Sequence, residues 1–323
     1  MKSLVIYHAD CTDGFGAAFA AWLKLGDKAE YLPMQYGFKP HEMPAFSDRV
    51  VYMLDFSWPR DLMCELFEKT ERVVWLDHHK TAFEMWCGAI PRSGYWIRND
   101  GEVSIPPLPN NAIVRLNDHK SGALLAWEHF HPDTKVPALI RHIDDRDRWQ
   151  FKLEGSRELH AALQSYKPWS FEQWRNYFWS PYTGDPAYFE EELERLLSDG
   201  VVILRAQEQN IASMLKQARK CEIFSVTGVP FGTNPKANMR QHNFAGLALN
   251  APMHMSEVGH ELANQSSTYG LVWYMGMDNR VKCSLRSNGE YDVSAIARAF
   301  GGGGHRNAAG FEIDIQTLIQ WLK

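Results

Sequence analysis

The first 80 residues alternate short apolar runs with longer amphipathic stretches. The apolar runs predict β-strands at 3–8, 29–34, 50–55 and 72–76. A helix over 14–25 is indicated by apolar residues at helical spacing, namely Phe15, Ala18, Phe19 and Trp22. Pro59 suits the first position of a second helix near 60–68. This order of strands and crossover helices implies a mostly parallel sheet.

The pattern changes after residue 87. Prolines and the pair Asn110 and Asn111 predict a loop or small surface excursion over 88–111, followed by helices near 120–130 and 135–147. Residues 155–218 have a helical pattern, strongest over Glu190–Gln217. Short apolar runs then return and predict strands at 223–226, 244–249, 271–275, 281–285 and 311–315, with a helix at 292–300.

These patterns predict an α/β protein in three parts. Residues 1–154 form an N-terminal domain with a mostly parallel β-sheet flanked by helices, 155–218 a helical connector, and 219–323 a smaller α/β domain. A chain of 323 residues is long enough for two domains of about 150 residues. We expect the active site in the cleft between the two domains, where pockets commonly lie.

Composition and charge restrict the partners. The chain is 45% hydrophobic and 23% charged, as in ordinary globular proteins. A net charge of -5 disfavours long duplex nucleic acid, which needs a basic surface, but not a short phosphorylated ligand. The five scattered cysteines suggest neither a disulfide framework nor a zinc knuckle. The first apolar run is too short for a signal peptide or membrane span, so we expect a cytoplasmic protein with no membrane partner.

Four apolar segments in the first half end in acidic or histidine residues. The residues that follow them are His8, Asp10 and Asp13; Asp55; Asp77, His78 and His79; and Asp144, Asp145 and Asp147. Ligands of open α/β sheets bind at the carboxyl ends of the parallel strands. Carboxylates and imidazoles delivered there repeatedly would surround divalent metal ions.

Simpler interpretations remain for some of these residues taken alone. The aspartates of the first motif and Asp55 are also typical helix caps or turn residues. The charge cluster around Asp145 also fits a solvated helix end. Asp77-His78-His79 is more specific, because two adjacent histidines after an apolar strand are hard to explain by packing, and a carboxylate can orient a ligating imidazole.

A second candidate site lies near the C-terminus. Gly301–Gly304 precede His305 and Arg306, and glycines let backbone amides approach a phosphate closely. A flexible linker is the alternative, although the flanking Phe300 and Ala308 look packed. Arg286, at the end of a predicted strand, is a further phosphate-binding candidate.

At these residues the chain resembles the DHH/DHHA1 phosphoesterase family, especially its short members that degrade oligonucleotides a few residues long. The first motif of the resemblance is Asp77-His78-His79, which matches the motif that names the family. The second is Gly302–His305 with Ala308–Gly310, which is similar to the signature of the C-terminal domain. Both motifs occur in the family's order and separation.

The resemblance implies two Mn²⁺ ions per chain, with Mg²⁺ or Co²⁺ as substitutes. His8, Asp10 and Asp55 would hold one ion. Asp13, Asp55, His78 and one aspartate of the fourth motif would hold the other. Asp77 would orient a histidine, and His79 would face the phosphate. The residues expected to grip the substrate are Arg286, Gly303, Gly304 and His305.

Two departures from the family pattern affect this assignment. The family places one residue between the two acidic ligands of its first motif, whereas two residues separate Asp10 from Asp13. Asp10 is therefore the residue more open to displacement or replacement. The fourth motif offers three aspartates where one ligand is expected, and we assign Asp145.

The function expected from this set is a Mn²⁺-dependent phosphodiesterase. It would hydrolyse short oligonucleotides or linear dinucleotides to nucleoside monophosphates, with two metals lowering the pKa of water and clamping the phosphate. One alternative is a phosphatase of pyrophosphate, polyphosphate or a bisphosphorylated nucleotide. Another is a nucleotide-binding regulatory module with a decayed metal site. The sequence is compatible with a homodimer and does not decide the oligomeric state.

Overall fold

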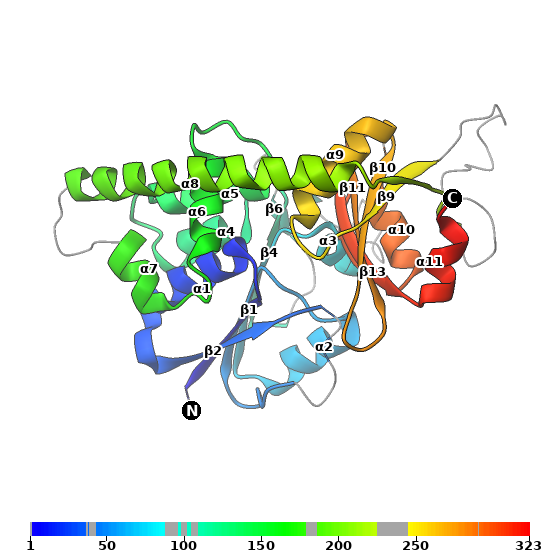
Figure 1. The fold of residues 1–323 in the computed structure, drawn as a ribbon. Coiled ribbons are helices and arrows are strands. Elements are labelled where there is room, and N and C mark those ends of the chain that lie inside the picture. Colours follow the sequence, from blue (N-terminus) through cyan, green and yellow to red (C-terminus); the bar gives the residue numbers. More distant parts are fainter. Residues whose placement is uncertain are drawn as a thin grey trace. The chain divides into compact units, whose positions relative to one another are not determined.

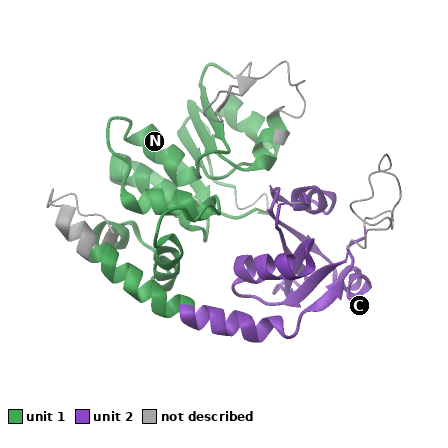
Figure 2. Cartoon of the chain, turned by 90° about the horizontal axis from the view of Figure 1, so that it is seen from above, with its two compact units in different colours: residues 1–204 green, residues 205–323 purple. Residues whose placement is uncertain are grey.

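The structure is a computed structural model that describes residues 2–36, 38, 43–87, 96–97, 102–104, 109–178, 186–224, 245–289 and 291–323. The chain divides into two compact units, Met1–Leu204 and Arg205–Lys323, which Figure 2 colours separately. The boundary between the units falls within the long helix α8 (Pro186–Leu215). Each unit has its own sheet and is described by itself.

Unit 1 is built on a seven-stranded sheet with the order β2-β1-β3-β4-β7-β6-β5. The strands are β1 (Ser3–His8), β2 (Ala29–Met34), β3 (Val50–Leu54), β4 (Arg72–Asp77), β5 (Trp96–Ile97), β6 (Glu102–Ser104) and β7 (Ala112–Asn117). Neighbours from β2 to β7 pair in parallel, whereas β6 and β5 add an antiparallel edge. The mostly parallel sheet predicted from the sequence is thus confirmed.

The helices of unit 1 cover both faces of this sheet (Figure 1). They are α1 (Thr12–Leu25), the 3-10 turn η1 (Gly26–Lys28), α2 (Arg60–Lys69), α3 (Lys80–Cys87), α4 (Gly122–Phe130), α5 (Ala138–Asp147), α6 (Ser156–Ser165) and α7 (Phe171–Phe178). In β1, Val5 packs with α1 and α4, while the adjacent Leu4 and Ile6 pack with α2. Burial on both faces explains why these strands are continuous apolar runs.

The prediction of a loop or small surface excursion over 88–111 did not include two short strands that the structure shows there. Residues 88–95, 98–101 and 105–108 lie outside the described part of the chain. The described residues between them form β5 and β6, which pair with each other and, through β6, with β7. Strand pairing, and not local composition, therefore decides the structure here.

Unit 2 contains a six-stranded mixed sheet with the order β12-β13-β11-β10-β9-β8. The strands are β8 (Arg219–Cys221), β9 (Gly246–Asn250), β10 (Tyr269–Met275), β11 (Val281–Ser287), β12 (Gly303–His305) and β13 (Ala308–Ile313). Only β9 and β10 pair in parallel among these described strands. The helices are α9 (Met255–Ser266), α10 (Val293–Ala299) and α11 (Ile315–Trp321).

The sequence located the core of unit 2 but not all of its edges. The predictions for β10, β11 and α10 are confirmed within a few residues. The last strand was predicted at 311–315, and β13 instead spans Ala308–Ile313. Strand β8 lies just before the strand predicted at 223–226, and residues 225 and 226 of that prediction lie outside the described part of the chain. The strand predicted at 244–249 corresponds to β9, and its first predicted residue, Phe244, also lies outside the described part. Neither α9 nor α11 was predicted: α9 is mostly polar, and α11 is only seven residues long.

The apolar side chains of unit 2 are buried on both faces of its sheet. Leu285 and Phe311 belong to one core with α10 and α11, and Val272 belongs to the other with α9 and the end of α8.

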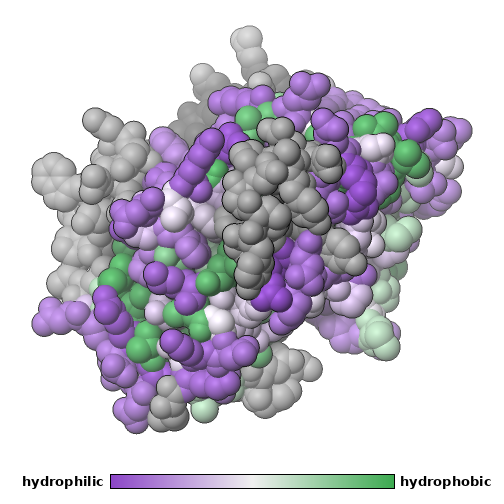
Figure 3. All heavy atoms as spheres, turned by 90° about the vertical axis from the view of Figure 1, so that its left-hand side faces the viewer, coloured by the Kyte–Doolittle hydropathy of each residue, from purple (hydrophilic) through white to green (hydrophobic). Residues whose placement is uncertain are grey.

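On the side of the molecule shown in Figure 3, hydrophilic residues separate small hydrophobic groups. In the described parts of the chain, no helix combines the length and apolar character that a membrane span needs.

Candidate metal and phosphate site

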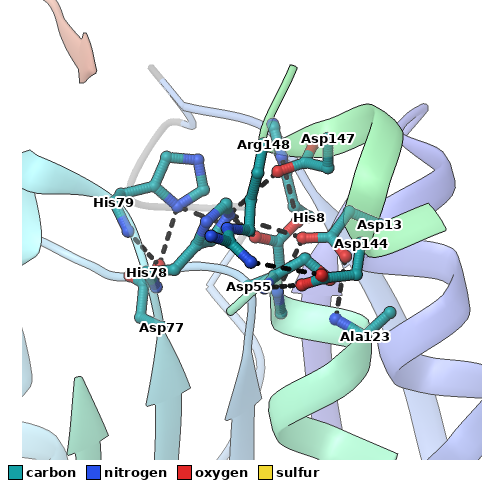
Figure 4. A network of polar contacts seen from close by, with 12 residues as sticks. His8, Asp13, Asp55, Asp77, His78, His79, Ala123, Asp144, Asp147 and Arg148 are labelled. Carbon is teal, nitrogen blue, oxygen red and sulfur yellow. Dashed lines mark hydrogen bonds and ion pairs between the residues drawn. The ribbon is translucent and has the colours of Figure 1, made fainter. Parts of the chain in front are cut away.

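The carboxyl ends of three neighbouring strands bring the first three motifs together. Strands β1, β3 and β4 lie side by side and parallel, so His8, Asp55 and His78 emerge at one edge of the sheet. Figure 4 shows these side chains gathered with Asp13 and Asp147 around a common point. The sequence positions are up to 139 residues apart, from His8 to Asp147, and the parallel sheet is what places them in one cluster.

Asp55 lies at the centre of the cluster. Its carboxylate is 1% exposed, with Oδ1 3.0 Å from Nε2 of His78 and Oδ2 3.6 Å from Nδ1 of His8. Among the described residues, neither oxygen makes a hydrogen bond of normal geometry. A buried carboxylate with unused lone pairs between two imidazoles is expensive unless a cation completes it. This environment fits a residue that bridges two metal ions.

The backbone around Asp55 is shaped to hold this position. Asp55 has a φ of 53°, a left-handed conformation that is uncommon for a residue with a side chain. Gly122, the first residue of α4, lies against it, and a Cβ atom at Gly122 would be 2.4 Å from Cβ of Asp55. A glycine is therefore required at this close approach. The sequence carried no signal for this role of Gly122.

Asp13 joins the cluster from the first turn of α1. Its two oxygens accept hydrogen bonds from the backbone N–H groups of Gly122 (2.7 Å) and Ala123 (2.8 Å), and Oδ2 lies 3.4 Å from Nε2 of His78. Burial, followed by the charges of Asp55 and Asp147, raises the pKa of Asp13 well above its usual value. A divalent cation would relieve this repulsion.

The electrostatics of the histidines indicate the same excess of negative charge. Burial alone would lower the pKa values of His8 and His78, but contacts with Asp55 raise both well above the usual value. Burial would raise the pKa of Asp55, and the contacts with His78 and His8 instead hold it below its usual range. Metal ions bind to such groups by displacing protons. The donor set of buried carboxylates and imidazoles therefore fits divalent ions.

Asp77 acts on the histidines that follow it. Its Oδ1 accepts hydrogen bonds from the backbone N–H groups of His78 (2.7 Å) and His79 (3.1 Å) and lies 2.7 Å from Nδ1 of His79. A carboxylate in contact with Nδ1 fixes the ring orientation and directs Nε2 away from Asp77. Asp77 thus holds the ring of His79 in place.

The fourth motif presents Asp147 to the cluster. Oδ2 of Asp147 lies 3.5 Å from Nε2 of His78. The assignment of Asp145 does not fit the structure, because its carboxylate accepts hydrogen bonds from Ser156 Oγ (2.6 Å) and the N–H groups of Lys152 and Leu153. Asp144 accepts from the N–H of Ser121 and from Arg148. Asp145 and Asp144 therefore anchor the chain around α5.

Asp10 is directed away from the cluster. It is exposed, has a φ of 58°, and its Oδ2 lies 3.4 Å from Nε2 of Gln35. Cys11, the next residue, instead has its sulfur within 4.8 Å of ligand atoms of His8 and Asp55. The sequence interpretation named Asp10 as the residue most open to displacement, but it did not identify Cys11.

The glycine-rich motif of unit 2 forms a strand. Gly303, Gly304 and His305 make up β12, which pairs with β13, so the motif is not a flexible linker. Gly304 has a φ of 136°, and a Cβ there would lie 2.5 Å from the carbonyl oxygen of Ala308. Close approach of two backbones therefore requires a glycine at this position.

The strand register places Arg286 and His305 in one row. Ala308 of β13 pairs with Arg286 of β11 on one side and with His305 of β12 on the other. Directly paired residues share a face of the sheet, and two strand spacings separate the backbones by about 10 Å. The guanidinium of Arg286 is held by Ser284 Oγ (2.9 Å) and Ser256 Oγ (2.7 Å). The row is suited to holding an anionic group.

Comparisons with known proteins agree with this description. The family profile described as DHHA1 domain matches residues 248–323, which include Arg286 and the glycine-rich strand. This match supports the resemblance for the C-terminal part of the chain, which contains the second motif.

Similar chains are also known over almost the full length. An uncharacterized protein, R106 of Acanthamoeba polyphaga mimivirus, is 28% identical over 95% of this chain, which spans 66% of that relative. A pGpG-specific phosphodiesterase, PggH of Vibrio cholerae, matches 99% of this chain and 96% of its own at 11% identity and a TM-score of 0.41. An exopolyphosphatase-related protein of Bacteroides fragilis covers 99% of this chain and 89% of its own, at 13% identity and a TM-score of 0.40.

Proposed function

We propose that this protein, whose C-terminal part is a DHHA1 domain, is a Mn²⁺-dependent phosphodiesterase. Its substrates would be short oligonucleotides or linear dinucleotides, and its products nucleoside monophosphates. The observation that carries the proposal is the environment of Asp55, a buried carboxylate without a hydrogen bond among the described residues that faces His8 and His78. Such a residue is suited to bridging two metal ions.

The residues proposed to hold the two ions follow from the cluster. His8 and Asp55 would bind one, and the other would be held by Asp13, Asp55, His78 and Asp147. Asp10 is left out of this set, because its side chain is directed away from the cluster and toward Gln35. Carboxylate and imidazole donors suit Mn²⁺. When bound, such a pair of ions lowers the pKa of water and offsets the charge that develops on phosphate oxygens.

The chain's own groups would position the substrate. Asp77 holds the ring of His79, which would donate a hydrogen bond or a proton to phosphate. In unit 2, Arg286 would bind a neighbouring phosphate through its fixed guanidinium, and His305 lies in the same row of the sheet. The N–H groups of Gly303 and Gly304 are proposed to approach the same anion.

The test is product analysis of purified protein. Labelled 2- to 10-mers, cyclic dinucleotides and pyrophosphate are incubated with Mn²⁺ and, in parallel, with a chelator. We expect nucleoside monophosphates from the short linear substrates with Mn²⁺ but not with the chelator, and a rate about 10³-fold lower for the Asp55→Asn variant. Release of phosphate from pyrophosphate without cleavage of dinucleotides would instead favour the phosphatase. Tight nucleotide binding without turnover or bound metal would indicate a regulatory module.

A further inference from the structure

Cys11 occupies an unusual place at the start of α1. It is the N-cap residue, with extended backbone (φ -112°, ψ 136°), yet its side chain makes no capping hydrogen bond among the described residues. The thiol is half-buried and is not part of a disulfide. Its sulfur lies within 4.8 Å of ligand atoms of both His8 and Asp55. The side chain is therefore directed to the cluster and not to the helix end.

A second, independent observation indicates a ligand at this point. Asp55 is 1% exposed, and within the described structure neither of its oxygens makes a hydrogen bond of normal geometry. Nδ1 of His8 is likewise buried without one. Three donor atoms of different residues thus converge, and two of the residues have unsatisfied polar atoms. Ligands around one metal ion are typically about 3.5 Å apart, which the limit of 4.8 Å allows.

The first motif lacks an oxygen ligand at this point. Asp10 would be the carboxylate of the resembled family, but its left-handed backbone and its contact with Gln35 direct it outward. Lys167 Nζ also donates a hydrogen bond to the carbonyl oxygen of Asp10 (2.9 Å), which holds the turn. A sulfur therefore faces His8 and Asp55 where an acidic oxygen is expected.

We propose that Cys11, as a thiolate, binds a metal ion together with His8 and Asp55, its proton passing to solvent. Thiolate, imidazole and carboxylate in one set favour Zn²⁺ or Co²⁺ over Mg²⁺ and Mn²⁺. The other position, formed by Asp13, Asp55, His78 and Asp147, offers only oxygen and nitrogen and keeps its preference for Mn²⁺. The inference rests on the proposed metal centre and refines the metal preference at one of its two positions.

The test uses the full-length protein stripped of metal and titrated with Co²⁺. A cysteine ligand gives a sulfur-to-cobalt charge-transfer band in the near ultraviolet, which we expect in the wild type and not in Cys11→Ser. Cys64→Ser is the matched control, because Cys64 is a half-buried free cysteine on α2 outside these ligand groups, and this variant should keep the band. We also expect Cys11→Ser to bind Zn²⁺ about 100-fold more weakly, while one Mn²⁺ still binds.

Two further measurements separate this inference from folding and from the proposed function. Zn²⁺ should slow alkylation of Cys11 in the wild-type protein, measured by mass spectrometry without any variant. Cys11→Asp should bind Mn²⁺ more tightly relative to Zn²⁺ than the wild type does. No cobalt–sulfur band in the wild type, or an unchanged band in Cys11→Ser, would overturn the role of Cys11 even if oligonucleotides are cleaved. A band without any hydrolysis would instead refute the phosphodiesterase and leave the metal ligand intact.

Discussion

The carboxylate of Asp55 is the side chain on which both metal positions depend. Asp55→Asn preserves its shape but removes a charge and one metal-binding oxygen. We expect kcat/KM to fall by about 10³-fold, equivalent to about 4 kcal/mol, because a bridging ligand is lost. Metal content per chain, measured on the same preparation, should fall in parallel. The metal-free variant should remain folded, with the circular-dichroism spectrum of the metal-free wild type, and near-normal turnover would refute the assignment.

The two aspartates of the fourth motif should respond differently to the same substitution. Asp147→Asn should weaken metal binding by about tenfold or more and leave the stability of the metal-free protein unchanged. Asp145→Asn should lower the free energy of unfolding by about 1–3 kcal/mol, since it disturbs buried hydrogen bonds with Ser156 and the following turn. Each variant serves as the control for the other. Metal binding is measured by calorimetry and stability by denaturant unfolding. If Asp145→Asn weakens metal binding and Asp147→Asn lowers stability, Asp145 is the ligand.

The sequence could predict some of these residues but not choose among others. Asp55 and His78 follow apolar strands directly, so the end of the strand fixes where they lie. Asp145 and Asp147 share the last turn of α5, and two residues on a helix are rotated by about 200°. They therefore face nearly opposite directions, and only the packing of α5 decides which one meets His78. No local pattern shows that position 122 must be a glycine so that the side chain of Asp55 can lie against it.

At the level of elements, α4 carries a histidine whose titration affects stability. His129 is half-buried beside Tyr52 of β3. Burial, together with the charges of Arg115 and Arg72, lowers its pKa from 6.5 to about 4. As the pH falls, His129 is protonated at a higher pH in the unfolded chain than in the folded protein. Its contribution to the free energy of unfolding is therefore fully present above pH 6.5 and is lost as the pH falls toward 4.

Replacing His129 should therefore flatten the pH dependence of stability. In His129→Gln, the free energy of unfolding between pH 6.5 and about 4 should decline by about 1–2 kcal/mol less than in the wild type, after allowance for solvent screening. Denaturant unfolding at several pH values measures this difference. His119→Gln, at an exposed histidine, is the control and should keep the wild-type slope. Equal slopes for His129→Gln and the wild type would refute the prediction.

Strand β11 allows a test of substrate binding that leaves the metals in place. Arg286→Ala should lower kcat/KM by about 10- to 100-fold, mainly through KM, because a charge-assisted contact with phosphate is lost. Lys282→Ala removes the same charge from the same strand, four residues earlier and beside Glu312, and should have little effect. Both variants should retain the wild-type metal content. Loss of metal from Arg286→Ala, with unchanged KM, would show that the roles are reversed.

Elements were predictable where burial imposed a pattern. The parallel strands β1, β3 and β4 are buried on both faces and were recognised as apolar runs, whereas the parallel strand β7, which is mostly half-buried, was not predicted. Strand β12 consists of two glycines and a histidine, and glycine has little tendency to form strands. Its conformation comes from pairing with β13, a contact that local sequence does not encode. The same holds for β5 and β6, which depend on β7.

At the level of the whole molecule, charge bears on the length of the substrate. The net charge is -5, and the proposed phosphate contacts are few, with Arg286 and His305 in one row of unit 2. A long strand would need an extended basic track to gain affinity with each added nucleotide. We therefore expect affinity to come from one or two phosphates and stacking of the adjacent bases.

Turnover should consequently depend on length in a specific way. We expect kcat/KM to be highest for substrates of about two to five nucleotides and to fall for longer ones, since further phosphates add no contact. Initial rates on a 3-mer and a 30-mer of the same repeating sequence, at equal molar concentration, measure this directly. A 3-mer without its terminal phosphate is a control for the role of that group. Equal rates with a processive ladder on the 30-mer would contradict the short-substrate proposal and favour a long-strand exonuclease.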